Sequence, residues 1–128
     1  MDKEYKLYPD IAPVSSHYSR AVRVGNMFFI AGCTANDSPA ENEGFPSQLR
    51  ETLGRIKAIM EAEGQTMDDV VKLTTFVVDI EGWAKNRVEV NSIFEEMFQG
   101  KYPANSVIHV APSLKPSLTV EIEAIAMF

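Results

Sequence analysis

The C-terminal stretch, residues 119–128, most constrains what the chain can fold into. It reads T-V-E-I-E-A-I-A-M-F, and side chains in a β-strand alternate between two faces. One face is small and apolar and suits packing under helices: Val120, Ile122, Ala124 and Ala126. Glu121 and Glu123 point the other way. Because a buried unpaired carboxylate is costly, these two side chains must face water, a partner chain or a binding site.

Length, charge and cysteine content limit the class of protein. The 128 residues, 45% of them hydrophobic, predict one domain over residues 1–128 with a core of its own. The formal charge of −6 argues against nucleic-acid binding, which needs a basic surface. No segment approaches the roughly 20 apolar residues of a membrane span, and the first ten residues lack an apolar signal core. The single Cys33 excludes an internal disulfide and fits a reducing compartment, so we expect a cytoplasmic protein.

Hydrophobic periodicity predicts two helices and about six strands. The helices are expected over Pro46–Glu63 and Gly82–Phe98, where apolar residues recur every three or four positions. The expected strands are Tyr5–Tyr8, Arg20–Val24, Met27–Gly32, one within residues 69–79, and two within residues 102–110 and 119–128. The dipeptide Gly25-Asn26 predicts a hairpin turn.

This order predicts a two-layer α+β domain with both helices on one face of a mixed, partly parallel sheet. Its second face is then left without a covering layer. We expect this face to mix polar and apolar side chains: Glu121, Glu123, Lys72, Thr74, Asn105 and His109 among Phe76, Val78, Val107 and Ile125. A half-apolar face of this kind is usually covered by self-association, so we expect a homo-oligomer.

Five short motifs follow one another along the chain: S-H-Y-S-R-A from Ser16, I-A-G from Ile30, V-N-S-I-F from Val90, F…Y-P-A from Phe98 and V-E-I-E-A-I-A from Val120. Together, from about Tyr18 to Ala126, they resemble the reactive intermediate deaminase (Rid, YjgF-type) family. The resemblance implies a chorismate-mutase-like fold and a homotrimer with its sheets facing inward. It also implies small-molecule pockets between subunits that hydrolyse enamine and imine intermediates to 2-keto acids and ammonia, without cofactor or metal.

The resemblance assigns roles to four residues. Glu121 matches the acidic residue that holds or activates the attacking water, and a carboxylate there accepts a proton from water and returns one to the leaving amine. Gly32 matches a glycine whose backbone lines the pocket, Tyr18 a pocket-wall tyrosine, and Asn91 a helix asparagine near the site. The structural alternatives remain open: Gly32 only ends a strand, Tyr18 only packs at an interface, and Asn91 only caps a loop.

One departure from the family pattern concerns substrate recognition. Active deaminases of the family carry an arginine, which binds the substrate carboxylate with two hydrogen bonds, where this chain has Asn105. Losing such a charge-assisted pair costs a few kcal/mol, or on the order of a hundredfold in affinity. Val107 also stands where some members carry cysteine, and Cys33 where glutamine is common. We therefore expect the substrate to be something other than a simple 2-imino acid.

Three residues offer compensation. Arg20, two residues after Tyr18, is a candidate replacement for the missing cation. His109 shares a strand face with Asn105, and histidine is the residue type suited to proton transfer near neutral pH. Cys33, next to Gly32, is a candidate reactive thiol. The structural alternatives are surface or interface positions for the two basic residues and inert packing for the cysteine.

Two functions follow from these residues. Retention of Glu121 favours a Rid-type hydrolytic deaminase, whereas loss of the arginine at Asn105 favours a trimeric small-molecule-binding or regulatory module without catalysis. No metal-ligand spacing connects Cys33, His17 and His109, so we expect no metal site.

Overall fold

The C-terminal strand β6 (Val120–Met127) lies inside a six-stranded sheet of order β1-β2-β3-β6-β4-β5. The computed structural model describes residues 1–112 and 115–128. β6 pairs antiparallel with β3 (Met27–Cys33) on one side and with β4 (Val70–Val77) on the other, and β5 (Ala104–His109) is parallel to β4. The remaining strands are β1 (Lys3–Lys6) and β2 (Ala21–Val24). The mixed six-stranded sheet is therefore confirmed.

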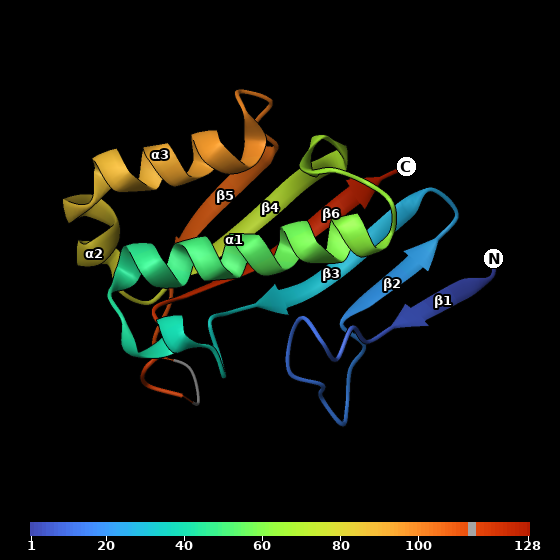
Figure 1. The fold of residues 1–128 in the computed structure, drawn as a ribbon, viewed down its shortest axis with the longest axis horizontal. Coiled ribbons are helices and arrows are strands. Elements are labelled where there is room, and N and C mark those ends of the chain that lie inside the picture. The colour runs from blue at the N-terminus through green and yellow to red at the C-terminus, as the bar shows by residue number, and fades with distance from the viewer. Residues whose placement is uncertain (113–114) are drawn as a thin grey trace.

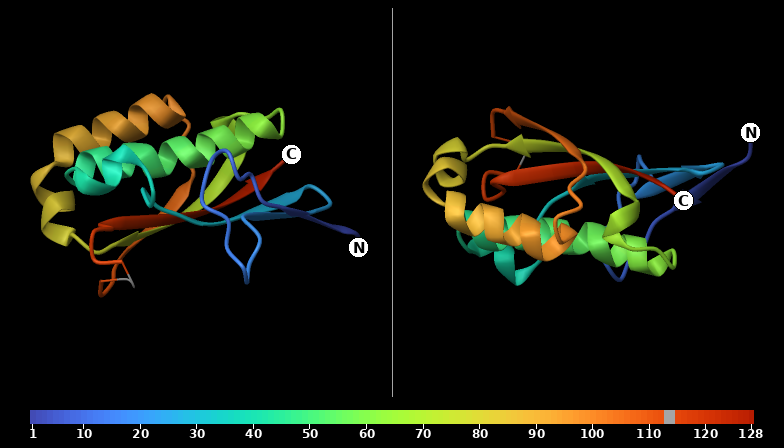
Figure 2. Two further views of the ribbon diagram at one scale, coloured as in Figure 1. Left: turned by 60° about the horizontal axis from the view of Figure 1, so that its bottom comes forward. Right: turned by 90° about the horizontal axis from the view of Figure 1, so that it is seen from above.

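The helices cover one face of this sheet, as the sequence predicts (Figures 1 and 2). α1 (Phe45–Ala62) lies across its middle, with α3 (Arg87–Phe98) beside it. The short α2 (Ile80–Lys85) and two 3₁₀ helices, η1 (Pro39–Asn42) and η2 (Met67–Asp69), complete the elements. In the part of the chain that the structure describes, no helix is both long and apolar enough to cross a lipid bilayer.

The core lies between α1, α3 and the sheet. The predicted inner face of β6 is buried, and its side chains alternate between buried and more exposed along the strand. α1 contributes the apolar stripe expected from its periodicity: Leu49, Leu53, Ile56, Ile59 and Met60, each fully buried. The antiparallel pairing of β6 with β3 and β4 places its apolar side chains directly under this stripe.

The predicted second helix differs from the structure. It begins earlier, at Ile80, because the Asp79 side chain accepts a hydrogen bond from the Gly82 backbone N–H at 2.9 Å and caps the first turn. It is also broken at Asn86, whose backbone leaves helical geometry. The Asn86 side chain donates to the Gly82 carbonyl oxygen at 2.7 Å, so that the amide competes with the helical backbone for this acceptor.

The predicted bounds of β1 and the predicted face of β5 were also wrong. β1 ends at Lys6 rather than Tyr8, because Tyr8 has a left-handed backbone with φ of 56°. In β5 the parallel register places Asn105, Val107 and His109 opposite Leu73, Thr75 and Val77, on the helix side of the sheet. These three residues therefore do not share the uncovered face with Glu121. All six residues of β5 are exposed, so no apolar alternation marked their register in the sequence.

Candidate functional site

Five of the predicted site residues line one pocket of about 330 Å³: Tyr18, Arg20, Gly32, Cys33 and Glu121. Its walls come from the loop before β2, the end of β3 and the start of β6. Lys115 and Leu118, in the segment that leads into β6, add to the lining, and so do Asn36 and Arg55. We call this space the Glu121 pocket.

A β-bulge brings Gly32 against the Glu121 carboxylate. Ile30 pairs with Ala124 and Cys33 with Ile122, so that Ala31 and Gly32 on β3 together oppose a single residue of β6. A side chain at position 32 would place its Cβ only 2.6 Å from Glu121 Oε2. Glycine is thus required here to make room for the carboxylate, which explains this glycine more directly than its expected role of admitting ligand.

Arg20 is buried, not a surface residue, and only 6% of it is exposed. Its Nη1 donates to the Gly32 carbonyl oxygen at 2.7 Å, and its Nη2 donates to the Pro13 carbonyl oxygen at 3.1 Å and to the Tyr18 hydroxyl at 3.4 Å. Nε has no hydrogen-bond partner among the described residues, and none of their carboxylates forms an ion pair with this guanidinium. Arg20 therefore connects the loop before β2, which carries Pro13 and Tyr18, to β3. It also places a positive charge beside the pocket that is not paired with an anion of the described residues.

The ionisation of Glu121 is shifted by these surroundings. Burial raises the pKa of this carboxyl above its ordinary value of 4.5, repulsion from Glu123 raises it further, and the Arg20 guanidinium acts in the opposite direction. A carboxyl group with a raised pKa is a better proton acceptor once it is ionised. Titratable groups shifted in this way concentrate at functional sites.

Cys33 has the properties of a packing residue rather than a reactive thiol. It is 1% exposed, and burial raises its pKa, with Arg20 acting in the opposite direction. A reactive cysteine instead has a lowered pKa and an accessible sulfur. Among residues 1–112 and 115–128, no three His, Cys, Asp or Glu side chains come together as a group that could hold a metal ion.

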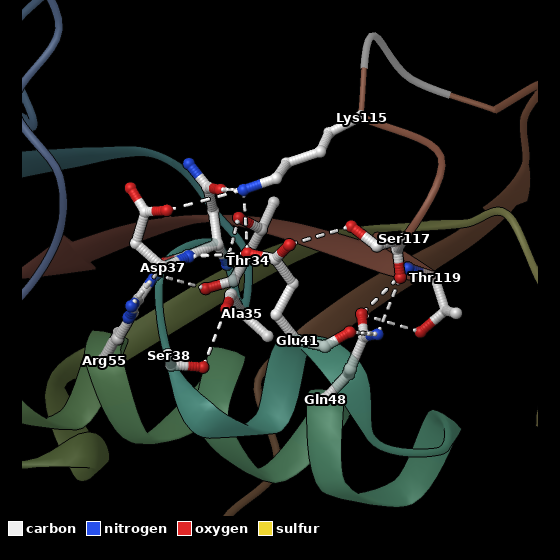
Figure 3. Close-up of polar contacts among 11 residues, drawn as sticks. Thr34, Ala35, Asp37, Ser38, Glu41, Gln48, Arg55, Lys115, Ser117 and Thr119 are labelled. Atoms are coloured by element: carbon white, nitrogen blue, oxygen red, sulfur yellow. Dashed lines mark hydrogen bonds and ion pairs between the residues drawn. The ribbon is translucent and has the colours of Figure 1, made fainter.

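A set of polar contacts, which we call the rim network, connects the loop after β3 to the segment before β6 at the border of the pocket (Figure 3). Lys115 Nζ donates to Asn36 Oδ1 at 2.5 Å and to Glu41 Oε1 at 2.8 Å. Glu41 Oε2 accepts from the Ser117 hydroxyl at 3.0 Å. The Lys115 ammonium and hydrogen bonding from Asp37 and Ser117 hold the pKa of Glu41 below its usual range.

Gln48, at the start of α1, completes the rim network. Its Nε2 donates to the carbonyl oxygens of Glu41 at 3.0 Å and Ser117 at 2.8 Å, and its Oε1 accepts from the backbone and hydroxyl of Thr119 at 2.9 and 3.0 Å. Every hydrogen-bonding position of this buried amide is occupied. Arg55, seven residues and therefore about two turns further along α1, donates to the carbonyl oxygens of Thr34 and Asn36 at 2.8 and 2.7 Å.

Two other predicted residues, Asn91 and Asn105, lie apart from Glu121. They line a second pocket of about 330 Å³, the Asn105 pocket, together with Leu73, Phe94, Tyr102 and Pro103. Asn91 lies inside α3, so it does not cap a loop. Val107 and His109 are exposed on the same strand and are not among the residues lining either pocket. One chain therefore carries two groups of predicted residues in separate pockets.

Sequence reasoning missed Arg55, Gln48 and Thr75. Arg55 and Gln48 belong to a helix that was interpreted through its apolar stripe alone, although polar residues next to that stripe are a signal for buried contacts. Thr75 donates from its hydroxyl to Asn105 Oδ1 at 2.9 Å. Its β-branched side chain suggested only a strand, and nothing in the sequence pointed to this contact.

Comparison with known proteins identifies the family and supports the fold. The family model described as Endoribonuclease L-PSP matches residues 10–128. A RutC family protein of Pyrococcus horikoshii is 37% identical over 113 residues, 85% of each chain. A protein of Salmonella typhimurium named 2-iminobutanoate/2-iminopropanoate deaminase is 36% identical over 115 residues, 86% of each chain. The crystal structure of RidA from the Antarctic bacterium Psychrobacter sp. PAMC 21119 superposes with a TM-score of 0.80 at 33% identity, covering 98% of this chain and all of the other.

The family model spans nearly the whole chain, and the relatives match it over most of their own length. The same fold recurs in the solved structure, from the N-terminal strands to the central strand that carries Glu121. The chain therefore belongs to the Rid (YjgF) family.

Proposed function

We propose that this protein is a hydrolytic deaminase of an imine or enamine metabolite, acting in clefts between the subunits of a homotrimer. The observation that carries the proposal is the position of the Glu121 carboxylate, which packs against Gly32 in a pocket that the buried, charged Arg20 also lines. Relatives named 2-iminobutanoate/2-iminopropanoate deaminase support the same reaction class.

Glu121 acts as a general base and then as a general acid. Its carboxylate accepts a proton from a water molecule while the water oxygen attacks the carbon of the C=N bond. The product is a tetrahedral carbinolamine, to whose nitrogen the Glu121 carboxyl returns the proton. The Glu121 carboxylate, ionised again, takes the proton of the carbinolamine hydroxyl as the C=O bond forms and passes it to the departing nitrogen as the C–N bond breaks, so that one imine and one water give one carbonyl compound and one ammonia. An enamine enters the same sequence after its carbon is protonated to the imine.

Asn105 makes a 2-imino acid a poor substrate. The amide provides neutral hydrogen bonds where a charged fork would be needed to hold a carboxylate. Arg20 does not replace that fork, because its Nη groups are already engaged by the backbone carbonyls of Pro13 and Gly32. Arg20 instead favours the ionised form of Glu121, which is the form that accepts a proton.

The test is an imine-hydrolysis assay with two sources of substrate. An L-amino acid oxidase supplies 2-imino acids, a monoamine oxidase supplies imines without a carboxylate, and semicarbazide traps whatever remains unhydrolysed. We expect the wild type to accelerate carbonyl release from the second source more than from the first. Glu121→Gln should lose about a hundredfold or more of the rate, the typical contribution of a general base. Glu123→Gln, two residues along the same strand face, is the matched control and should retain it.

The pH dependence gives a second readout. Since Glu121 must be ionised to accept a proton, the rate should fall as the pH is lowered through its raised pKa, and this limb should lie above pH 4.5. Equal activity of wild type and Glu121→Gln would exclude this role for the carboxylate. If no imine from either source is hydrolysed faster than in buffer, the chain is instead a non-catalytic binding module on the same scaffold.

A further inference from the structure

Thr75 and Asn105 form a polar pair at the parallel edge of the sheet. Thr75, on β4, is fully buried, and its hydroxyl is 2.9 Å from Oδ1 of Asn105. Asn105, on the neighbouring strand β5, is exposed and lines the Asn105 pocket. One end of the amide is thus held by a buried group, while the residue as a whole borders the space where a ligand would lie.

The contact fixes which end of the amide faces the pocket. A threonine hydroxyl has one proton to donate, and Asn105 Oδ1 is its acceptor among the described residues. With the amide reversed, the buried hydroxyl would accept from Nδ2 and its own proton would be left without an acceptor, which is unfavourable. The oxygen of Asn105 is therefore occupied. Its NH₂ group makes no hydrogen bond within the described part of the chain and remains available as a double donor.

The surroundings of this NH₂ group do not favour an anion. The residues that line the pocket with Asn105 carry no formal charge: Leu73, Asn91, Phe94, Tyr102 and Pro103. The Tyr102 hydroxyl donates to Glu95 Oε2 at 2.5 Å, which brings a carboxylate close to the pocket wall. Lys72, on β4, donates to Ser106 Oγ at 2.9 Å, and the register places both on the opposite face of the sheet from Asn105. A bound carboxylate would lose water here without gaining a counter-charge from these residues.

We propose that Thr75 is a positioning residue that turns the Asn105 amide so that its NH₂ group binds a neutral carbonyl oxygen of the substrate, such as that of an amide or ester. The inference rests on the proposed function and narrows its substrate class. The group next to the reacting imine carbon is then an uncharged hydrogen-bond acceptor, and the pocket disfavours both a carboxylate and a group that can only donate.

The test measures binding, not turnover, with two product-like probes of nearly equal size: pyruvamide, which is neutral, and pyruvate, which is charged. Side-chain amide signals of ¹⁵N-labelled protein report on Asn105, which is assigned by the signal missing in Asn105→Ser. We expect pyruvamide to move the Asn105 signals and to bind about tenfold more tightly than pyruvate, the difference that one well-placed hydrogen bond makes.

Variants at position 75 then separate orientation from packing. Thr75→Val keeps the side-chain shape without the hydroxyl and should lose the preference for pyruvamide, whereas Thr75→Ser should keep it. Thr74→Val, at the neighbouring position on the other face of β4, is the control and should behave as wild type. Asn105→Asp keeps an oxygen for Thr75 but loses the NH₂ group, and should bind pyruvamide at least tenfold more weakly.

Tighter binding of pyruvate than of pyruvamide by the wild type would overturn the inference. It would also be overturned if the preference persisted in Thr75→Val and Asn105→Asp, or if neither probe moved the Asn105 signals. Because no turnover is required, a protein that selects pyruvamide but hydrolyses no imine would refute the deaminase and leave this recognition standing. A protein whose imine hydrolysis depends on Glu121 but which does not prefer pyruvamide would support the deaminase and refute this recognition.

Discussion

The contact between Gly32 and Glu121 links a backbone requirement to the proposed chemistry. A β-bulge presents the Gly32 backbone to the carboxylate, and the Gly32 carbonyl oxygen accepts from Arg20 at 2.7 Å. Gly32 therefore contacts both the Glu121 carboxylate, which is the proposed base, and the Arg20 guanidinium beside it. The carboxylate of Glu121 occupies the space that a side chain at position 32 would fill, so this role requires glycine. The hydrogen bond from Arg20 uses only the backbone carbonyl oxygen.

Gly32→Ala should reduce activity with little effect on stability. The new Cβ would lie 2.6 Å from Glu121 Oε2, and the carboxylate is the mobile end of a flexible side chain, so it moves and the strands do not. A displacement of about 1 Å in a reacting group lowers the rate by about a hundredfold, whereas we expect the free energy of unfolding to change by less than about 1 kcal/mol. Imine-hydrolysis rates and urea unfolding of the same preparation measure both quantities.

Gly54→Ala is the matched control for this substitution. Gly54 lies within α1, and no atom lies within 4 Å of the position its Cβ would occupy. The substitution should stabilise the protein by about 0.5–1 kcal/mol, because alanine has the higher helix propensity, and should leave activity unchanged. If Gly32→Ala were as active as the wild type while activity still required Glu121, the close contact between Gly32 and the Glu121 carboxylate would be unimportant for catalysis.

At the scale of elements, the site depends on how α1 is joined to the start of β6. The buried Gln48 amide binds backbone carbonyls of two segments and accepts two hydrogen bonds from Thr119, next to the strand that carries Glu121. Glu41 and Lys115 bridge the same two segments on the outer side. The rim network therefore fixes the distance between the loop after β3 and the beginning of β6.

Gln48→Leu should destabilise the fold by about 3 kcal/mol, because it leaves several buried polar groups without partners. The substitution should also loosen the structure locally. The Thr119 backbone N–H, which donates a hydrogen bond to Gln48 Oε1 in the wild type, should exchange its proton with solvent faster. Ser47→Ala is the control, since the Ser47 hydroxyl makes no hydrogen bond to a described residue. Unchanged exchange at Thr119 together with unchanged urea stability would contradict this role for Gln48.

The sequence was sufficient for elements whose burial leaves a pattern. β6 was predicted with its faces, because one face is buried and the other carries two carboxylates. The face of β5 was not, because all its residues are exposed and its register is set by pairing with β4. The break at Asn86 depends on a side-chain contact with Gly82 that periodicity does not reveal.

For the site, the motifs identified residues that the structure brings together, but not what they contact. Tyr18, Gly32 and Glu121, which the resemblance assigned to a site, line one pocket together with Arg20 and Cys33, whereas Asn91 lines another. The burial of Arg20 and its two backbone carbonyl acceptors depend on the bulge in β3, which no local sequence signal marks. The Thr75 contact depends on a register between strands that lie far apart in the chain.

At the scale of the whole molecule, the sheet face opposite the helices is uncovered by any described element (Figure 2). Large apolar side chains on this face remain about two-fifths exposed: Phe29 at 41%, Ile108 at 43% and Met127 at 41%. The predicted site is likewise divided, with Glu121 in one pocket and Asn105 in another. We expect self-association to cover this face, and we propose that neighbouring subunits place the Glu121 pocket of one chain beside the Asn105 pocket of the next.

Mixed assemblies test this arrangement. Glu121→Gln and Asn105→Asp chains, each first shown to have lost activity on the imine that the wild type hydrolyses fastest, are unfolded together and refolded at equal concentration. If each site takes Glu121 from one subunit and Asn105 from its neighbour, about a quarter of the clefts regain both residues, and about a quarter of wild-type activity returns. If both residues of a site come from one chain, none returns.

Sedimentation should give three times the chain mass of 14.2 kDa, and different affinity tags on the two variants verify mixing. Verified mixing without recovered activity would place each complete site within a single subunit, and a monomer at micromolar concentration would exclude the trimer itself.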